Sequence, residues 1–344
     1  MGSVALFVPH VGCPQQCSFC DQRAITGGAQ PPEPWQVWQA AQAAASHLGQ
    51  RVKETEIAFF GGSFTAIPRG QMLALLAPAK EAVERFGFRG LRCSTRPDAI
   101  DGEVLSLLKA YHMVAVELGA QSMDGEVLRR KPPGPQPRGH RPGGGAHPRR
   151  GAGAGLADDD RPVRLHPGEG VETARALIAL QPATARVYPT VVLEGTHLAA
   201  LYRQGATITP QTLEEAVAPV RPGCWPLFEE AGGAVIRVGL HAQAGCGCAG
   251  RVAGPYHPAF RELVESRRFL SRLLPELERR GPGAYQVRVC PRQLSAATGQ
   301  RRANVEALAQ RGYRVRFAPD RELPFGGFLL ERQETRNEKG KLAQ

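Results

Sequence analysis

Three cysteines in a short stretch near the start of the chain constrain its fold most. The sequence from Pro9 to Cys20 reads P-H-V-G-C-P-Q-Q-C-S-F-C, which places Cys13, Cys17 and Cys20 at Cys-x3-Cys-x2-Cys spacing. An apolar run from Val4 to Val8 precedes it, as is typical of a β-strand that ends at a Gly-Cys-Pro turn. Thiolates are ligands for zinc and for iron–sulfur clusters. We therefore expect a metal-binding loop directly after the first strand.

The spacing favours a cluster over a single zinc ion. A structural zinc ion takes four ligands, and Asp21 is the only further candidate close to the three cysteines. A four-iron cluster held by three cysteines keeps one iron open for another molecule, so a missing fourth ligand is useful there. A zinc loop and three unrelated buried thiols are the alternatives.

Strands and helices alternate after this loop. Apolar runs and helical periodicity predict strands at Thr55–Phe60, Leu91–Thr95 and Met113–Leu118, and helices at Trp35–Leu48, Met72–Phe86 and Asp101–Ala110. Such alternation builds a parallel sheet, and functional groups gather at the carboxyl ends of its strands. Three motifs stand at these ends: G-G-S-F-T (Gly61 to Thr65), S-T-R-P-D (Ser94 to Asp98) and E-L-G-A-Q-S (Glu117 to Ser122).

Two of these motifs carry features that need an explanation. The glycines of G-G-S-F-T allow a ligand to approach the backbone closely, although an ordinary strand-to-helix turn would look the same. Glu117 is a charge in an apolar strand and is costly to bury without a partner. Arg96, at a neighbouring strand end, is the nearest candidate partner. An internal ion pair without any chemistry is the alternative.

With Phe19 before its last cysteine, the cysteine motif resembles that of the radical S-adenosylmethionine superfamily. The resemblance implies that Cys13, Cys17 and Cys20 hold a 4Fe-4S cluster whose open iron is chelated by S-adenosyl-L-methionine. One electron then cleaves the sulfonium and releases a 5′-deoxyadenosyl radical. An electron donor of the flavodoxin or ferredoxin type is the implied partner. The residues expected to line the cofactor are Gly61, Gly62, Ser63, Arg96, Glu117 and Gln121, and no catalytic side chain is assigned.

The motifs together resemble one branch of this superfamily, the catalytic subunit of Elongator and its stand-alone prokaryotic relatives. The run R-V-Y-P-T-V-V-L-E-G-T-H-L-A-A-L-Y-R-Q-G (Arg186 to Gly205) is similar to that branch as well. The resemblance implies tRNA as a partner, modified at a wobble uridine. It does not extend to an acetyltransferase domain. The alternatives are a porphyrin-processing or methylthiotransferase-like enzyme, and an impaired protein that only binds a cluster or RNA.

Residues 131–170 interrupt the pattern where the next helix and the fifth strand of the parallel sheet are expected. Ten of these forty residues are Gly and eight are Pro, and too few are apolar to form a core. We interpret the stretch as read out of frame, because a shift of one nucleotide can turn the codons of Gly155 to Leu165 into G-L-Q-M-M-T-G-L-Y-G. A flexible insertion is the alternative. Cys224, Cys246 and Cys248 lie in weaker stretches of the same kind and are not counted as ligands.

The end of the chain predicts a small second domain. The sequence indicates strands at Ala234–Leu240, Tyr285–Val289 and Tyr313–Phe317, and helices at Pro258–Glu278 and Ala303–Gln310. Its arginines form either a solvated face or a surface for RNA: Arg288, Arg292, Arg301, Arg302, Arg311, Arg314 and Arg316. We expect a core at residues 1–218, this domain at 230–330, and a polar tail at 331–344.

Composition sets the remaining limits. The net charge of +11 permits attraction to nucleic acid. No apolar run reaches the length of a membrane span, and the start of the chain does not look like a signal peptide. Eight cysteines in such a chain favour a reducing compartment, and we expect a cytoplasmic protein without a membrane partner. The predicted fold class is α/β: a partial parallel (β/α)6 TIM-like barrel, interrupted around its fifth strand, with a small C-terminal α/β domain.

Overall fold

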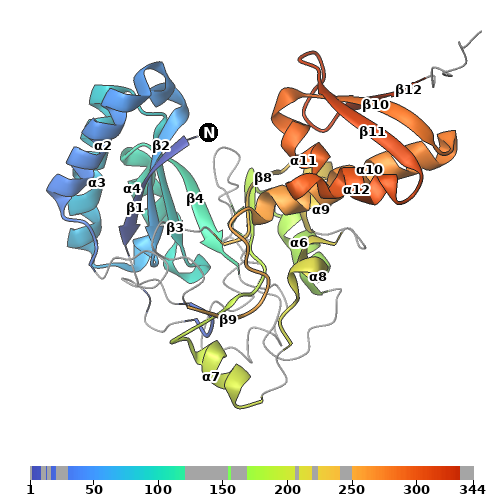
Figure 1. Cartoon of the computed structure of the whole chain (residues 1–344). Helices are drawn as coiled ribbons and strands as arrows, with labels where there is room; N and C mark the ends of the chain where they lie inside the picture. The colour runs from blue at the N-terminus through green and yellow to red at the C-terminus, as the bar shows by residue number, and fades with distance from the viewer. Residues whose placement is uncertain are drawn as a thin grey trace, which may run out of the picture. The chain divides into compact units, whose positions relative to one another are not determined.

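The structure of the chain is a computed structural model (Figure 1). It describes residues 2–8, 13, 17–20, 30–120, 154–155, 169–205, 209–218, 224–240 and 250–333. The chain divides into two compact units. The first comprises Met1–Ala216 and Pro222–Pro258, and the second comprises Val217–Arg221 and Ala259–Gln344.

A parallel sheet forms the centre of the first unit. Its strands follow the order β1 (Gly2–Val8), β2 (Thr55–Gly61), β3 (Gly90–Thr95), β4 (Met113–Gly119) and β5 (Ala154–Gly155), and each neighbouring pair is parallel. The intervening elements are α2 (Pro34–Leu48), η1 (Gly49–Glu54), η2 (Phe64–Ala66), α3 (Arg69–Phe86), η3 (Pro97–Ala99) and α4 (Gly102–Ala110), where η marks a 3-10 helix. Figure 1 shows α2, α3 and α4 on one side of the sheet. The strands and helices predicted for this part of the chain are confirmed.

The helices α2, α3 and α4 cover one face of this sheet. Ile57, Phe59, Leu91 and Cys93 point into the core between sheet and helices and are fully buried. Because side chains alternate along a strand, the residues between them point to the opposite face. That second face carries the charged side chains of the central strands, which are described below.

Shorter elements complete the first unit: α6 (Glu169–Ile178), β6 (Thr184–Val187), β7 (Val192–Leu193), α7 (His197–Arg203), α8 (Leu213–Val217, at the boundary), α9 (Cys224–Glu230), β8 (Ala234–Val238) and β9 (Arg251–Ala253). Strand β6 pairs with β8 in parallel, and β7 pairs with β9 antiparallel. The sequence assigned the strand at Ala234–Leu240 to the second domain, starting at residue 230. The structure places it in the first unit, because its backbone pairs with β6.

The prediction for residues 131–170 lies almost wholly outside the described residues. Within that range only Ala154–Gly155 and the start of α6 are described. Ala154 pairs with Leu118 and Gly155 with Gly119, which adds the short β5 to the edge of β4. The frameshift interpretation therefore stays a prediction.

The second unit is a three-stranded sheet packed on helices. Its elements are α10 (Phe260–Arg280), β10 (Gly283–Val289), η5 (Pro291–Gln293), α11 (Leu294–Thr298), η6 (Gln300–Arg302), α12 (Ala303–Ala309), β11 (Tyr313–Pro319) and β12 (Phe328–Arg332). The central strand β10 is parallel to β11 and antiparallel to β12. Phe269, Leu273 and Leu277 of α10 pack against Tyr285 and Val287 of β10.

The predicted polar tail begins too early at residue 331. Glu331 and Arg332 belong to β12, which the sequence analysis missed, and Glu331 accepts a hydrogen bond from Arg288 at 2.9 Å. Residues 334–344 lie outside the described part of the chain. Among the described residues, no helix combines the length and the apolar character needed to cross a bilayer.

Candidate functional site

The turn after β2 lies directly against the end of β1. The Gly62 N–H donates to the Val8 carbonyl at 2.6 Å, and Gly61 has a φ of +111°. A Cβ atom on Gly61 would lie 3.1 Å from the carbonyl carbon and oxygen of Val8. Glycine is therefore required here by both its conformation and its surroundings. The carboxyl ends of the first two strands meet at this point, where the cysteine loop begins.

A chain of hydroxyl groups joins G-G-S-F-T to S-T-R-P-D. The Arg96 backbone N–H donates to Ser63 Oγ at 3.0 Å, and Ser63 Oγ lies 3.0 Å from Thr95 Oγ1. Thr95 Oγ1 lies 2.6 Å from Thr65 Oγ1, which donates to the Ala99 carbonyl at 2.6 Å. Each hydroxyl can donate only one proton. Because Thr65 donates to the Ala99 carbonyl, Thr95 must donate to Thr65, and Ser63 must donate to Thr95. The Ser63 hydroxyl proton is thus used within the protein.

Cys13 and Cys17 lie in an electropositive environment beside this chain. The pKa of the Cys13 thiol is raised, because burial outweighs the opposing effects of a hydrogen bond from the Ser63 backbone N–H and of the charge of Arg96. The pKa of Arg96 is raised, first by its hydrogen bond to Asp98 and also by the Cys13 and Cys17 thiolates. Amide and guanidinium groups stabilise thiolates, the form in which cysteine binds metals.

The cysteine loop is held in place by the run that follows β7. The Ser18 carbonyl accepts a hydrogen bond from the Leu198 N–H at 2.7 Å, at the start of α7. Phe19 packs against the apolar cluster of Val192, Leu198 and Ala199. The Cys20 N–H donates to the Cys17 carbonyl at 2.9 Å and closes a turn within the loop. The aromatic residue of the cysteine motif therefore anchors the loop to the E-G-T-H-L segment.

Three cysteine thiols are suitable ligands for an iron–sulfur cluster, but in this structure they do not converge on a common metal position. In the described part of the chain, no group of three or more His, Cys, Asp or Glu side chains is placed to hold a metal ion. The assignment of Cys13, Cys17 and Cys20 as ligands therefore rests on their spacing and on the surroundings of Cys13 and Cys17. Cys93, Cys224 and Cys290 are buried elsewhere.

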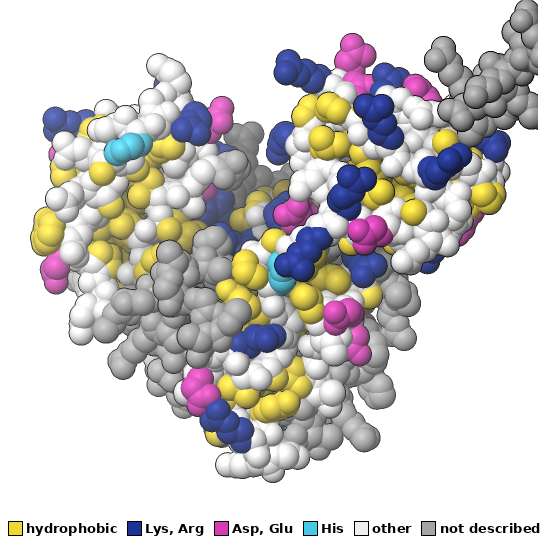
Figure 2. Space-filling view, viewed as in Figure 1, with side chains coloured by type: hydrophobic (Ala, Val, Ile, Leu, Met, Phe, Trp, Pro, Cys, Tyr) yellow, Lys and Arg dark blue, Asp and Glu magenta, His cyan; other side chains and the backbone are white. Residues whose placement is uncertain are grey.

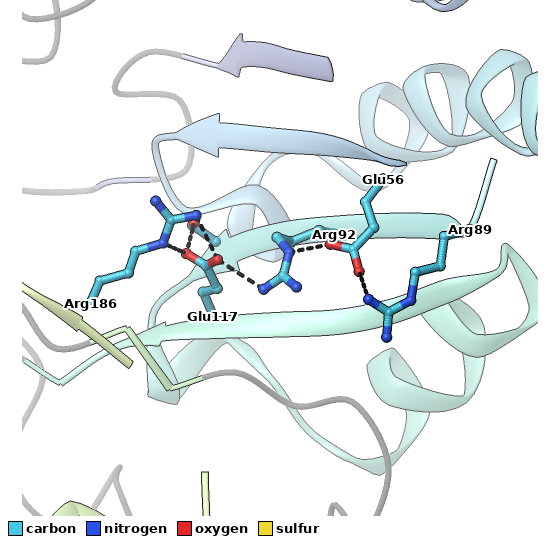
Figure 3. Close-up of polar contacts among 6 residues, drawn as sticks. Glu56, Arg89, Arg92, Glu117 and Arg186 are labelled. Carbon is cyan, nitrogen blue, oxygen red and sulfur yellow. Dashed lines mark hydrogen bonds and ion pairs between the residues drawn. The ribbon is translucent and has the colours of Figure 1, made fainter. Parts of the chain in front are cut away.

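Glu117 lies in a row of alternating charges on the second face of the sheet (Figure 3). Arg92 Nη1 donates to Glu117 Oε1 at 3.0 Å, and Arg92 Nε donates to Glu56 Oε2 at 2.6 Å. Arg186 of β6 binds both oxygens of Glu117, with Nε 2.7 Å from Oε2 and Nη2 2.8 Å from Oε1. Arg89 lies 3.4 Å from Glu56 at the other end of the row. Both carboxylates are thus paired on two sides.

The expected pairing of Glu117 with Arg96 is wrong. Arg96 points to its own turn instead, where its Nε donates to Asp98 Oδ1 at 2.9 Å and its Nη2 pairs with Oδ2. The partners of Glu117 are Arg92 and Arg186, which both lie within strands. Arg92 in turn pairs with Glu56, and the side chains of Glu56 and Arg92 are only 2% and 6% exposed. The sequence contained the signal, since both are charges in apolar strands, as Glu117 is. Sequence reasoning applied that argument to Glu117 alone.

Arg186 links the row to a strand that comes much later in the sequence. Its guanidinium lies 4.9 Å from the centre of the Phe60 ring, which adds a cation–π contact to the ion pair. Burial acts to lower the pKa of Arg186, but Tyr188 and Glu117 outweigh it and the pKa is raised. The strands β4 and β6 are therefore joined through side chains. Gln121, the remaining predicted cofactor residue, lies outside the described residues.

Two family models match the sequence. The model of the radical SAM superfamily matches residues 7–137, and that of the radical SAM C-terminal domain matches residues 182–269. Together they span well over half of the chain, which belongs to the radical SAM superfamily. Members are enzymes that use a 4Fe-4S cluster and S-adenosylmethionine. No curated protein sequence matched the chain.

One solved structure shows the same fold. The chain is similar to Elp3 from the archaeon Methanocaldococcus infernus, with a TM-score of 0.51 and 16% identity, over 79% of this chain and 63% of that one. It also matches coproporphyrinogen III oxidase (HemN) from Escherichia coli, with a TM-score of 0.44 and 15% identity, over 78% of this chain and 58% of that one. The likeness to Elp3 supports the predicted partial TIM-like barrel. The chain spans less than two thirds of the length of either protein.

Proposed function

We propose that Cys13, Cys17 and Cys20 hold a 4Fe-4S cluster with which the protein cleaves S-adenosylmethionine reductively. The observation that carries the proposal is that Cys13, the Gly61–Gly62 turn and Arg96 lie together at the carboxyl ends of β1, β2 and β3. Ligands bind at this end of a parallel sheet. When bound, the cluster supplies the electron that breaks the sulfonium bond of S-adenosylmethionine.

The chain's own residues prepare this place in three ways. The Ser63 N–H and Arg96 partly offset the cost that burial imposes on a thiolate at Cys13. The N–H of Gly62 is already bonded to Val8, so Gly62 can offer only its carbonyl oxygen, which suits an ammonium group. The Ser63 hydroxyl serves the internal chain to Thr95, so Ser63 contributes to cofactor binding through its backbone.

For Glu117 we propose a different role from that of a free carboxylate at a cofactor. Arg92 and Arg186 occupy both of its oxygens, so a cofactor hydroxyl would have to share them. We therefore assign Glu117 to positioning Arg186 beside Phe60. Arg186 then presents a fixed positive charge on the sheet face away from the helices.

For the substrate we propose a tRNA, modified at a wobble uridine. The proposal is supported by the T-R-P-D, E-L-G-A-Q-S and R-V-Y-P-T motifs, which resemble those of the Elongator branch, and by the net charge of +11. The fold likeness to Elp3 is compatible with it. The electron donor would be of the flavodoxin or ferredoxin type.

Anaerobic reconstitution tests the cluster. The protein should take up about four irons per chain and show the visible absorption of a thiolate-ligated cluster. Alanine at Cys13, Cys17 or Cys20 should abolish the absorption and the formation of 5′-deoxyadenosine with dithionite.

Two buried cysteines provide the matched control. Cys93→Ala and Cys290→Ala remove a thiol elsewhere in the chain and should leave iron content unchanged. Full cluster loading of a triple variant without Cys13, Cys17 and Cys20 would refute the ligand assignment.

A further inference from the structure

The middle of the second unit is strongly basic. From Pro291 to Pro319, all of which the structure describes, the sequence has six arginines and a single acidic residue, Glu306. Figure 2 shows Lys and Arg side chains spread over the visible face of this unit, with Asp and Glu between them. A local excess of this size makes the segment a candidate for binding a polyanion.

Two of these arginines have an unusual backbone conformation. Arg301 and Arg302 are consecutive, exposed, and left-handed, with φ of +52° and +66°. This conformation costs an L-residue energy that glycine or asparagine would avoid. Strain of this kind persists where the surroundings enforce it and is concentrated at functional sites. The sequence thus keeps two arginines where stability alone would select other residues.

Hydrogen bonds and close packing hold the turn between α11 and α12, which contains Arg301 and Arg302. Gly299 has a φ of +81°, and a Cβ there would lie 2.8 Å from the Asn304 backbone nitrogen. The buried Asn304 Nδ2 lies within 3.3 Å of four acceptors: the Ser266 carbonyl and Oγ, and the Ala296 and Ala297 carbonyls. These bonds tie the end of α11 to α12 and to α10. They hold the turn in shape while the side chains of Arg301 and Arg302 reach into solvent.

An exposed aromatic ring stands near the other end of α11. Phe325 is 54% exposed, and the Arg292 guanidinium lies 5.9 Å from the centre of its ring. Gln293 Oε1 accepts a hydrogen bond from the Gly326 N–H at 2.8 Å, which fixes the loop between β11 and β12 next to η5. An exposed ring with an arginine over it is a platform on which an unpaired base can stack.

We propose that Arg301, Arg302, Arg292 and Phe325, at the two ends of α11, form one surface that binds single-stranded RNA. The two left-handed arginines contact backbone phosphates, and Phe325 with Arg292 stacks a base. The order of strand, helix, glycine turn, helix and strand is shared by KH domains, in which a Gly-X-X-Gly turn between two helices clamps the nucleotide backbone. Here the fourth position is Arg302, which adopts the backbone conformation that a glycine would have.

Single-stranded RNA fits the surface better than a duplex does. Stacking on Phe325 needs a base that is free of its own neighbours, as in RNA loops and ends. A duplex would offer phosphates to the arginines but no base to the ring. The choice of RNA over DNA rests on the proposed tRNA substrate, whereas the binding surface itself is independent of the radical chemistry.

Binding of a labelled single-stranded RNA oligonucleotide of mixed sequence to the full chain tests the proposal. The measurement is made over a range of salt concentrations, without S-adenosylmethionine or reductant, so a failure of the proposed cleavage does not affect it. The variant R301G/R302G should lower the slope of log affinity against log salt by about 1.4, since each phosphate contact on a single strand contributes about 0.7. Over a fourfold rise in salt, the native chain should then lose about sevenfold more affinity than the variant.

Glycine relieves the left-handed strain, so the thermal unfolding temperature of R301G/R302G should not fall. R301K/R302K retains the charges and should retain the native slope. Phe325→Ala should weaken binding at least about fivefold without changing the slope, because it removes stacking and no charge.

A control variant removes two other arginines of the second unit, which lie outside the proposed surface. Arg314 and Arg316 are exposed on β11 and alternate with Val315, which packs against the core, so they lie on the sheet face away from the helices. R314Q/R316Q should leave the affinity within about twofold of native, because these side chains make no contact in the proposed surface. An equal loss in both double variants would overturn the proposal, as would native affinity in R301G/R302G. Tighter binding of the matching duplex or of single-stranded DNA would also overturn it.

Discussion

The same strands of the first unit carry two polar networks of opposite character. At the carboxyl ends of β2 and β3, Ser63, Thr95 and Thr65 form a neutral chain of hydroxyls. On the second face of the sheet, Glu56, Arg92 and Glu117 form part of a row of buried charges. The first network sets the shape of two turns, and the second one holds strands together.

The two networks differ in what happens when one member is lost. A broken hydroxyl chain leaves a neutral donor or acceptor unsatisfied, which is a limited cost. A broken charge row leaves buried ions with fewer opposite charges around them, which is a much larger cost. The charge row should therefore dominate stability, while the hydroxyl chain should affect mainly the geometry of the turns at the proposed cofactor site.

The largest effect is expected from Arg92→Met. Arg92 bonds to both buried carboxylates of the row, and its removal leaves each with a single arginine partner at one end. We expect a loss of about 3–5 kcal/mol in the free energy of unfolding. Tryptophan fluorescence in urea measures it, because Trp35, Trp38 and Trp225 all belong to the first unit.

Arg92→Lys is the matched variant, since it retains the charge but cannot reach both carboxylates in the same way. Its loss should be smaller than that of Arg92→Met. Equal losses, or a loss below about 1 kcal/mol for the methionine variant, would show that the row behaves like a solvated surface pair.

Thr95→Val should have a smaller effect on stability. Valine has nearly the same shape, but it removes the acceptor of the buried Ser63 hydroxyl and the donor to Thr65. The expected loss is about 1–3 kcal/mol in the same assay. Removing all three hydroxyls in S63A/T65V/T95V should cost less than three times this amount, because fewer polar groups are then left unsatisfied. An additive loss would argue against a continuous chain.

The smallest effect is a pH dependence of the free energy of unfolding. It arises from Cys93 on one face of the sheet, whose pKa is affected by Glu117 on the other face. Burial raises the pKa of the Cys93 thiol, and the negative charge of Glu117 raises it further, against the opposing effect of Arg92. In the unfolded chain the thiol has a pKa of about 8.5, whereas in the folded chain it stays protonated at that pH. Above that pH the free energy of unfolding should fall by about 1.4 kcal/mol per pH unit on account of Cys93. Cys93→Ala should remove this part of the slope, and an unchanged slope would contradict the burial argument.

The sequence predicted the first four strands and their helices because apolar periodicity determines both. Ile57 and Phe59 alternate with residues of the other face, and the helix α2 follows a proline-rich start. The strand β12 was missed, because Leu329, Glu331 and Arg332 are exposed and leave little apolar pattern. The strand β8 was assigned to the second domain, because strand pairing with β6 leaves no trace in local sequence.

The candidate site was predictable to the extent that its residues lie in short motifs. Gly61, Ser63 and Arg96 were found because their motifs follow strands, and the structure brings them together. The partners of Glu117 were not found, because Arg186 lies on a distant strand and its position depends on the fold. Three-dimensional packing decides which hydroxyl donates to which and which carboxylate each arginine pairs with. The spacing of residues in the sequence does not show either.

The hydrogen bond between Ser18 and Leu198 has a consequence for the order of folding. The cysteine loop is synthesised early, but the residues that anchor it come much later in the chain. At typical rates of synthesis the delay is on the order of 10 to 40 s, far longer than a loop of this size takes to fluctuate. The three cysteines therefore leave the ribosome before their anchor exists, and the loop reaches its final contacts only after the segment around α7 has been made.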